Sequence, residues 1–168
     1  EEVAASLSLT PADLGDLEAL PIQIASTGLN KIFVPVPSLE ALKRIEPNLA
    51  EIDRISRHHD AIGMYCYSLE TLHDSTAHCR NFAPVVGISE DSATGTSAAA
   101  LSCVLHRYGQ LASTESLNLV FEQGYSIDEP SELHVLLKVS NGAISQVKVA
   151  GRATLREARE FAIEEEKG

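Results

Sequence analysis

Tryptophan is absent from these 168 residues, methionine occurs once, and aromatic residues make up only 5% of the chain. Basic residues are scarce as well: 13 lysines and arginines stand against 24 acidic residues, which gives a net charge of −11 at pH 7. A protein that binds nucleic acid through its phosphates needs a basic surface. The charge balance therefore argues against a nucleic-acid partner, although a small anion can still bind locally at a helix N-terminus.

Long apolar runs and paired cysteine motifs are also missing. No stretch is long enough to span a bilayer, and the acidic, amphipathic start EEVAASLSL does not have the form of a signal peptide. The three cysteines, Cys66, Cys79 and Cys103, show no C-x-x-C spacing, and their odd number argues against a disulfide framework or a zinc site. We therefore expect reduced, buried thiols in a cytoplasmic protein without a membrane partner.

Phosphate-loop and metal-binding patterns are missing too. Gly87, Gly95 and Gly109 form neither a P-loop nor a dinucleotide-binding motif. His58 and His59 are neighbours on a predicted helix, where successive side chains point about 100° apart, so they are poorly placed to share a metal ion. We predict no metal site.

What the chain does have is the composition of a globular protein, with 44% hydrophobic residues and enough length for one domain over residues 1–168. Apolar residues at helical spacing predict helices over 1–9, 38–45 and 48–59. The fold class is α+β, with a mixed, mostly antiparallel sheet. Runs with strand character predict about eight strands, among them PIQIASTG, KIFVPV, IGMYCYSL, AHCRNFAPVVG, SLNLVFEQG, SELHVLLKVS and GAISQVKVAG.

Local signals mark the ends of several elements. Pro35 and Pro37 close the run KIFVPV and predict that this strand lies at a sheet edge. Ser38 is a candidate N-cap of the helix that follows, and Asn141-Gly142 predicts a type I′ hairpin turn. At the C-terminus, RATL is a candidate further strand, and REAREFAIEEEKG is a candidate helix or frayed end.

The most apolar helix is predicted over about 96–108. From Ser97 to Leu105 its only polar side chains are Ser97 and Ser102, so the helix is apolar nearly all round. A surface helix has a single apolar stripe instead. We therefore expect this central hydrophobic helix to have strands wrapped around it and to be the most buried element.

The start of this helix is polar. Its first N–H groups have no partner within the helix, so the amides of Gly95, Thr96 and Ser97 can form a cradle for a carboxylate, with Gly95 allowing close approach of the ligand. Asp91 precedes the cradle, where a carboxylate suits general acid/base chemistry or a hydrogen bond to substrate. Under the alternative interpretation, Asp91, Thr94 and Thr96 only cap the helix.

The segment CRNFAPVVGISEDSATGTSAAAL resembles the signature R-x-F-x-P…G-x-x-E-D-P-A-T-G-S-A of the phenazine-biosynthesis PhzF-like proteins. The resemblance continues through IQIASTGLNKIFVPV before it and VFEQG…PSELHV…VKVAGRA after it. It covers nearly the whole chain, but only as the second of the family's two domains. It implies the diaminopimelate epimerase fold, in which each domain wraps a sheet around a central hydrophobic helix and the active site lies in the cleft between the domains.

The resemblance also implies an activity: isomerisation of a small carboxylic acid by proton transfer, without metal or organic cofactor. The best-known family member is trans-2,3-dihydro-3-hydroxyanthranilate isomerase. The family's general acid/base glutamate lies in the first domain, so we expect this chain to be a fragment or processed product that needs the missing first domain and is inactive alone. The alternative is a stand-alone ligand-binding or interaction domain without catalysis, for example a homodimer whose two copies imitate the two-domain cleft.

By the same resemblance, Asp91 matches the motif aspartate, which is a polar active-site group. Gly95 and Thr96 match the Gly-Ser pair whose amides and hydroxyl hold the substrate, and Ser97 adds the next amide of the cradle. Gly28 matches a glycine in a turn beside the cleft.

Some matches are ambiguous and some positions depart from the signature. Arg80 and Phe82 lie on the strand before the motif, where a packing or ion-pair role is as plausible as a catalytic one. Ser92 replaces the motif proline, and Asp128-Glu129 stand where the family often has Gly-Arg, which reverses a charge and leaves the substrate open. No cysteine falls in the motif loop, so the two-thiol mechanism of related epimerases and racemases is not supported.

Overall fold

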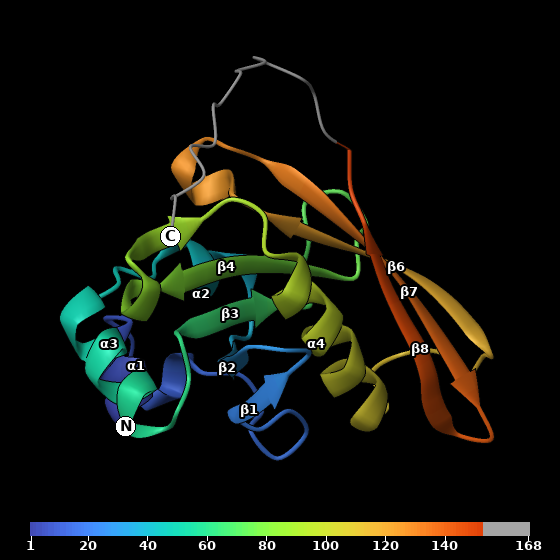
Figure 1. Ribbon diagram of the computed structural model, residues 1–168. Helices are drawn as coiled ribbons and strands as arrows, with labels where there is room; N and C mark the ends of the chain where they lie inside the picture. The colour runs from blue at the N-terminus through green and yellow to red at the C-terminus, as the bar shows by residue number, and fades with distance from the viewer. Residues whose placement is uncertain (153–168) are drawn as a thin grey trace, which may run out of the picture.

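The computed structural model describes residues 1–152, in which eight strands form one curled sheet around the long helix α4 (Gly95–Arg107), as Figure 1 shows. Three shorter helices are α1 (Glu2–Ser6), α2 (Leu39–Lys43) and α3 (Leu49–His58). The strands are β1 (Gln23–Ser26), β2 (Asn30–Pro35), β3 (Met64–Ser68), β4 (Ala77–Ala83), β5 (Ile88–Asp91), β6 (Ser116–Gln123), β7 (Ser131–Ser140) and β8 (Ala143–Ala150).

The sheet has the order β1-β2-β3-β4-β6-β7-β8, and β5 pairs with β4 outside this path. Pairs β2–β3 and β4–β6 are parallel, whereas the other strand pairs are antiparallel. The predicted α+β class and the mixed, mostly antiparallel sheet of eight strands are confirmed. Within residues 1–152, no helix combines the length and the apolar character needed to cross a bilayer.

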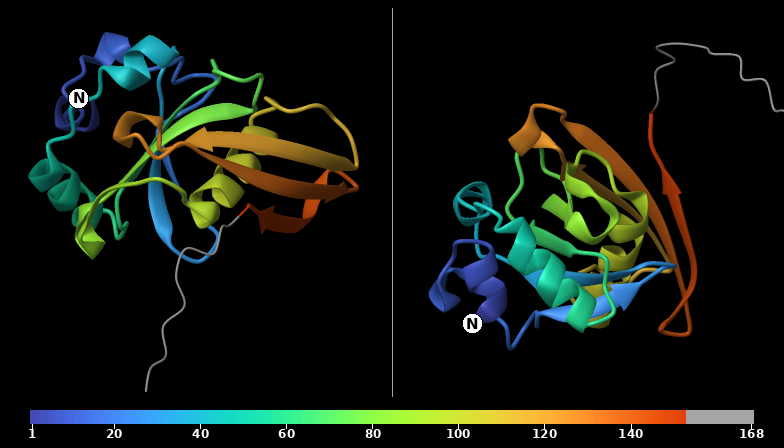
Figure 2. Two further views of the ribbon diagram at one scale, coloured as in Figure 1. Left: turned by 90° about the horizontal axis from the view of Figure 1, so that it is seen from above. Right: turned by 60° about the vertical axis from the view of Figure 1, so that its left-hand side comes forward.

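Each face of the sheet buries its own apolar cluster. On β2, Ile32 and Val34 pack with residues of α1, α2 and α3, whereas Phe33 points to the other face and packs with α4. This alternation follows from the two-residue period of a strand. Figures 1 and 2 show α1 and α3 grouped at one end of the molecule, apart from α4. Because a fully buried Leu, Ile or Phe contributes about 1.5–3 kcal/mol, the second cluster fixes α4 against one face of the sheet, and the first fixes the three short helices against the other.

Helix α4 packs against β1, β7 and β8, and Ser97 to Ser102 are all buried. Its observed bounds differ by one residue from the predicted 96–108. The expectation that it is the most buried element was wrong, because β3 and β4 contain no exposed residue at all. Those strands lie in the middle of the sheet and are covered on both faces, whereas α4 leaves Thr96 and Arg107 exposed.

The prediction of an edge position for KIFVPV was also wrong, because β2 lies between β1 and β3. The short strand β1 pairs with β2 only as far as Phe33. Pro35 therefore lies beyond the end of β1, where its missing N–H removes no hydrogen bond from that pair.

Other local signals are confirmed. The Ser38 hydroxyl accepts from the Ala41 amide at 3.1 Å and caps α2. Asn141 and Gly142 have φ values of 52° and 77°, the positive values that a type I′ turn requires. The candidate strand RATL, after its first residue, and the whole candidate helix REAREFAIEEEKG lie outside the described residues.

All three cysteines are free thiols, and two of them are buried as expected, whereas Cys103 is only half-buried. Burial raises the pKa of Cys66 and of Cys79 to about 12, so both thiols are protonated and unreactive at neutral pH. The cytoplasmic location inferred from these thiols stays a prediction.

The burial of α4 generates a stability prediction. Ala100 is 3% exposed in the middle of the helix, and Ala100→Asp would bury an unpaired carboxylate there. We expect this substitution to lower the free energy of unfolding by about 3 kcal/mol or more. Denaturant unfolding measures the change, and Ala112→Asp, at an exposed loop position, is the matched control. Equal unfolding midpoints for the two variants would contradict the burial of α4.

Candidate functional site

The N-terminal end of α4 meets the end of β5, which places Asp91 beside the first turn of the helix. The N-cap residue Thr94 donates its hydroxyl to Asp91 Oδ2 at 2.6 Å. The first helix amide that hydrogen-bonds is that of Ala98, which donates to Thr94 O at 3.0 Å. Within residues 1–152, the N–H groups of Gly95, Thr96 and Ser97 donate to no protein acceptor. Asp91 and Thr94 thus bond each other and do not cap these amides.

Gln123, the last residue of β6, joins this loop to the sheet. Its Nε2 donates to Asp91 O at 2.6 Å and to Thr94 Oγ1 at 3.0 Å. Its Oε1 accepts from the Tyr65 hydroxyl at 3.0 Å and from the Thr94 amide at 3.3 Å. Gln123 is fully buried, and both ends of its amide are satisfied, so the side chain holds the loop rigidly.

The turn between β1 and β2 reaches the same place. The Thr27 hydroxyl donates to Thr96 O at 2.9 Å, which ties the turn to the first turn of α4. Gly28 has a φ of +142°, a backbone conformation that favours glycine, and there is open space where its side chain would lie. The structure therefore brings the Gly28 turn and the three cradle residues to one end of α4, and their role in binding stays a prediction.

Gly95 has a different neighbour from the one expected. A β-carbon at this position would lie 3.2 Å from Val149 Cγ1 on β8. The glycine therefore allows close approach of a neighbouring strand, and the close approach of a ligand that we expected stays a prediction.

The turn between β6 and β7 packs on the motif loop. A β-carbon on Gly124, whose φ is +85°, would lie 2.1 Å from Glu129 O and 3.0 Å from Ser92 O, so only glycine fits. The Ser131 hydroxyl also donates to Ser92 O. Asp128 and Glu129, which depart from the family signature, thus belong to a turn in direct contact with the loop that carries Asp91.

Lys31 on β2 is a buried charge that the sequence analysis missed. Its side chain is 3% exposed, and its ammonium donates to Phe82 O at 3.4 Å. Burial lowers the pKa of Lys31 to about 8, and the negative charge of Asp91 partly opposes that effect. Buried titratable groups beside a charge partner are concentrated at functional sites.

Two buried polar atoms near this end of the sheet have no hydrogen-bond partner among the described residues. They are Ser97 Oγ, on the first turn of α4, and Asn81 Oδ1, on β4. Asn81 pairs in register with Asp91. Because buried polar groups normally find partners, these atoms mark places that suit a water molecule or a polar ligand group.

Arg80, by contrast, has a structural role. Its guanidinium forms two hydrogen bonds with the Glu90 carboxylate, at 2.9 and 2.8 Å, and donates to the carbonyls of Leu42 and Ile45. It also lies 5.0 Å from the centre of the Phe82 ring. These contacts join β4 and β5 to α2, so the structure favours the ion-pair and packing role for Arg80 and Phe82.

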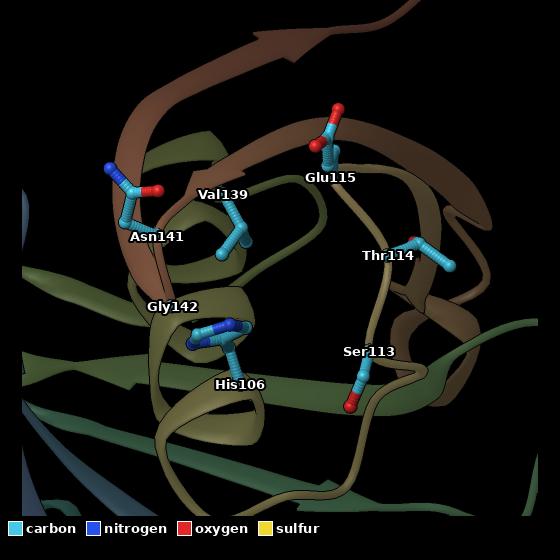
Figure 3. A pocket seen from close by; sticks show the side chains of 7 residues that line it. All are labelled: His106, Ser113, Thr114, Glu115, Val139, Asn141 and Gly142. Carbon is cyan, nitrogen blue, oxygen red and sulfur yellow. The ribbon is translucent and has the colours of Figure 1, made fainter.

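A hollow of about 530 Å³ lies at the opposite, C-terminal end of α4. Figure 3 shows that His106 and Glu115 on its rim do not point toward one another. It therefore lacks the converging polar groups of a catalytic site. Its lining residues are His106, Ser113, Thr114, Glu115, Val139, Asn141 and Gly142.

A mixed sheet curled around a central hydrophobic helix is the diaminopimelate epimerase-like fold. A hydroxyproline epimerase from Agrobacterium vitis shares this fold, with a TM-score of 0.54 over 76% of this chain and 40% of that one, at 10% identity. The chain belongs to the PhzC-PhzF family of phenazine biosynthesis-like proteins, whose family model matches residues 1–159.

Curated and solved relatives agree with this assignment. An uncharacterized isomerase from Deinococcus radiodurans is 33% identical over 92% of this chain and 49% of its own length. The trans-2,3-dihydro-3-hydroxyanthranilate isomerase of Pseudomonas chlororaphis is 28% identical over 78% of this chain and 44% of its own. The crystal structure of a Bacillus anthracis PhzF-family phenazine biosynthesis protein matches with a TM-score of 0.79 and 27% identity, over 90% of this chain and 51% of that one. The chain spans about half the length of the curated relatives it matches.

The hydrogen bonds of Gln123 generate a further prediction. Gln123→Ala removes the partner of the buried Tyr65 hydroxyl and frees the Asp91 loop, so we expect the free energy of unfolding to fall by about 1–3 kcal/mol. Gln110→Ala, at an exposed position, is the matched control and should change stability by less than about 0.5 kcal/mol. Denaturant unfolding of both variants measures the difference, and equal losses would show that Gln123 does not hold the loop.

Proposed function

We propose that this chain supplies part of the active site of a cofactor-independent isomerase, which moves a proton on a small carboxylic acid. The observation that carries the proposal is the first turn of α4, where three amides without an acceptor in the described part of the chain lie beside the Asp91 carboxylate. Such amides, together with the helix dipole, favour an anionic group. Family membership and the activity named for the Pseudomonas chlororaphis relative support this class of reaction and substrate.

Each predicted site residue has a role in this proposal. The amides of Gly95, Thr96 and Ser97 bind the substrate carboxylate, and the exposed Thr96 hydroxyl adds a donor. Gly28 keeps the neighbouring turn free of a side chain. Asp91 uses Oδ2 to accept from Thr94, whereas its Oδ1 has only a long, 3.5 Å contact with the Ala93 amide. That oxygen is therefore the one that can hydrogen-bond to substrate or exchange a proton with it.

We propose in addition that a second body completes the site: the first domain of a longer protein or a second copy of this chain. Moving a proton between two positions of a substrate requires a correctly placed acid or base. Within residues 1–152, no second carboxylate or histidine is hydrogen-bonded to Asp91, Thr94 or Gln123. The length of the relatives, about twice that of this chain, supports the first arrangement.

Titration with benzoate, monitored through backbone amide NMR shifts, tests the proposed site. We expect the Gly95, Thr96 and Ser97 amides to shift in a saturable way. The affinity should be weak and should fall with added salt, because the chain carries a charge of −11 and the helix dipole contributes only about 0.3–1 kcal/mol.

The first turn of α3 is an internal control, because the Asn48 side chain accepts from the Glu51 amide and caps that helix. Its amides should not move during the titration. Shifts confined to distant residues would mean that the start of α4 binds no anion. Turnover of trans-2,3-dihydro-3-hydroxyanthranilate by the isolated chain would contradict the second half of the proposal, that another body completes the site.

A further inference from the structure

The proposed carboxylate site has an electrostatic difficulty. Asp91 brings a negative charge close to the amides that would hold a second negative charge, and the whole chain is acidic. Like charges a few ångströms apart repel each other strongly where water is excluded. A cation near Asp91 would remove that repulsion.

Lys31 is the buried cation in this part of the sheet. On β2 it comes two residues before Phe33, whose side chain packs in the α4 cluster, so the alternation of the strand places Lys31 on the α4 face. Its ammonium reaches the carbonyl of Phe82, the residue next to Asn81, and Asn81 pairs in register with Asp91. Asn81 Oδ1, which has no hydrogen-bond partner within residues 1–152, is a further buried polar atom on the strand that pairs with β5.

Few other charges act on this ammonium. The thiol of Cys66 on β3 is close enough to affect it, but burial raises the pKa of that thiol to about 12, so it is neutral at pH 7. Arg80 on β4 is paired with Glu90. Strand β1 contains no titratable residue, and the first turn of α4 contains no acidic or basic one. Among the described residues, Asp91 is therefore the carboxylate that acts on the Lys31 ammonium, although the two form no direct ion pair.

A buried ammonium with one long hydrogen bond to a neutral carbonyl is costly unless an opposite charge supports it. We propose that Lys31 is a positioning residue of the carboxylate site: its ammonium balances the charge of Asp91, so that the amides of α4 bind an anion without repulsion. This inference rests on the function proposed above. Because the lysine has a pKa of about 8, the balance is present below that pH and is lost as the pH rises through it.

The first test is a pH titration of Lys31 itself, monitored by NMR of its side chain. In Asp91→Asn the titration midpoint should move to lower pH than in the unmodified chain, because the supporting negative charge is gone. Asp128→Asn, at an exposed position in the β6–β7 turn, is the matched control and should leave the midpoint unchanged. A midpoint that is the same in Asp91→Asn as in the unmodified chain would overturn the pairing.

Benzoate affinity is the second test. It separates a balance of charge between Lys31 and Asp91 from a direct contact between Lys31 and benzoate. At pH 7, Lys31→Met should weaken binding about tenfold, the equivalent of about 1.4 kcal/mol. The double variant Lys31→Met/Asp91→Asn should recover affinity to within about twofold of the unmodified chain, because both charges are gone. Equal weakness of the single and double variants, or unchanged affinity in Lys31→Met, would overturn the proposal.

The pH dependence of benzoate binding is the third test, with the conservative variant Lys31→Arg as its control. Benzoate binding to the unmodified chain should weaken between pH 7 and pH 9, whereas Lys31→Arg should keep its affinity, since a guanidinium stays charged. Loss of binding in Lys31→Arg at pH 7 would contradict the proposal. If the unmodified chain binds no benzoate at the α4 amides, the proposed function fails, and the Lys31 titration still decides whether the two charges are paired. If Lys31→Met does not fold, the Lys31 titration in Asp91→Asn remains the test of the proposal.

Discussion

The burial of α4 constrains everything else in this structure. Its middle is mostly alanine, leucine and valine, so the helix is stable only when strands cover most of its surface. The sheet curls around it and leaves its first turn at the place where β1, β5 and β6 converge. A buried helix must still find partners for its N-terminal amides, and here the protein supplies none within residues 1–152. The anion-binding position that we propose would thus be a consequence of how the core is packed.

The polar groups around that position divide into two kinds. Gln123 and its partners form a closed network in which every bond is satisfied, and this network fixes the loop that carries Asp91. Among the residues that the structure describes, Ser97 Oγ and Asn81 Oδ1 are buried without hydrogen-bond partners, and the Lys31 ammonium donates a single long hydrogen bond. Rigid scaffolding beside unsatisfied polar atoms is the arrangement expected where a ligand or water completes the structure.

Much of the fold and part of the candidate site could be predicted from the sequence, because the strongest signals are local. The period of apolar residues located the strands and α4, and the polar segment at the start of α4 pointed to Asp91 and the cradle amides. The inferred family is confirmed by the match over residues 1–159. The catalytic and binding roles of the site residues stay predictions.

What the sequence could not supply depends on long-range pairing. Gln123 meets Asp91 across 32 positions of the chain, and Lys31 meets Phe82 across 51, through strand order and register that no local pattern encodes. The edge position predicted for the strand that ends at Pro35 was wrong for a related reason. The length of β1 decides whether a proline on β2 removes a hydrogen bond between the two strands. Gln123 did carry one local signal: it is a polar residue that ends an apolar strand directly before a glycine.

A crystal structure of the chain soaked with benzoate shows whether the first turn of α4 holds a carboxylate. We expect carboxylate oxygens about 2.7–3.2 Å from the amide nitrogens of that turn, on the side of the Asp91 loop. A carboxylate bound in the hollow at the other end of α4, with only water at those amides, would contradict it.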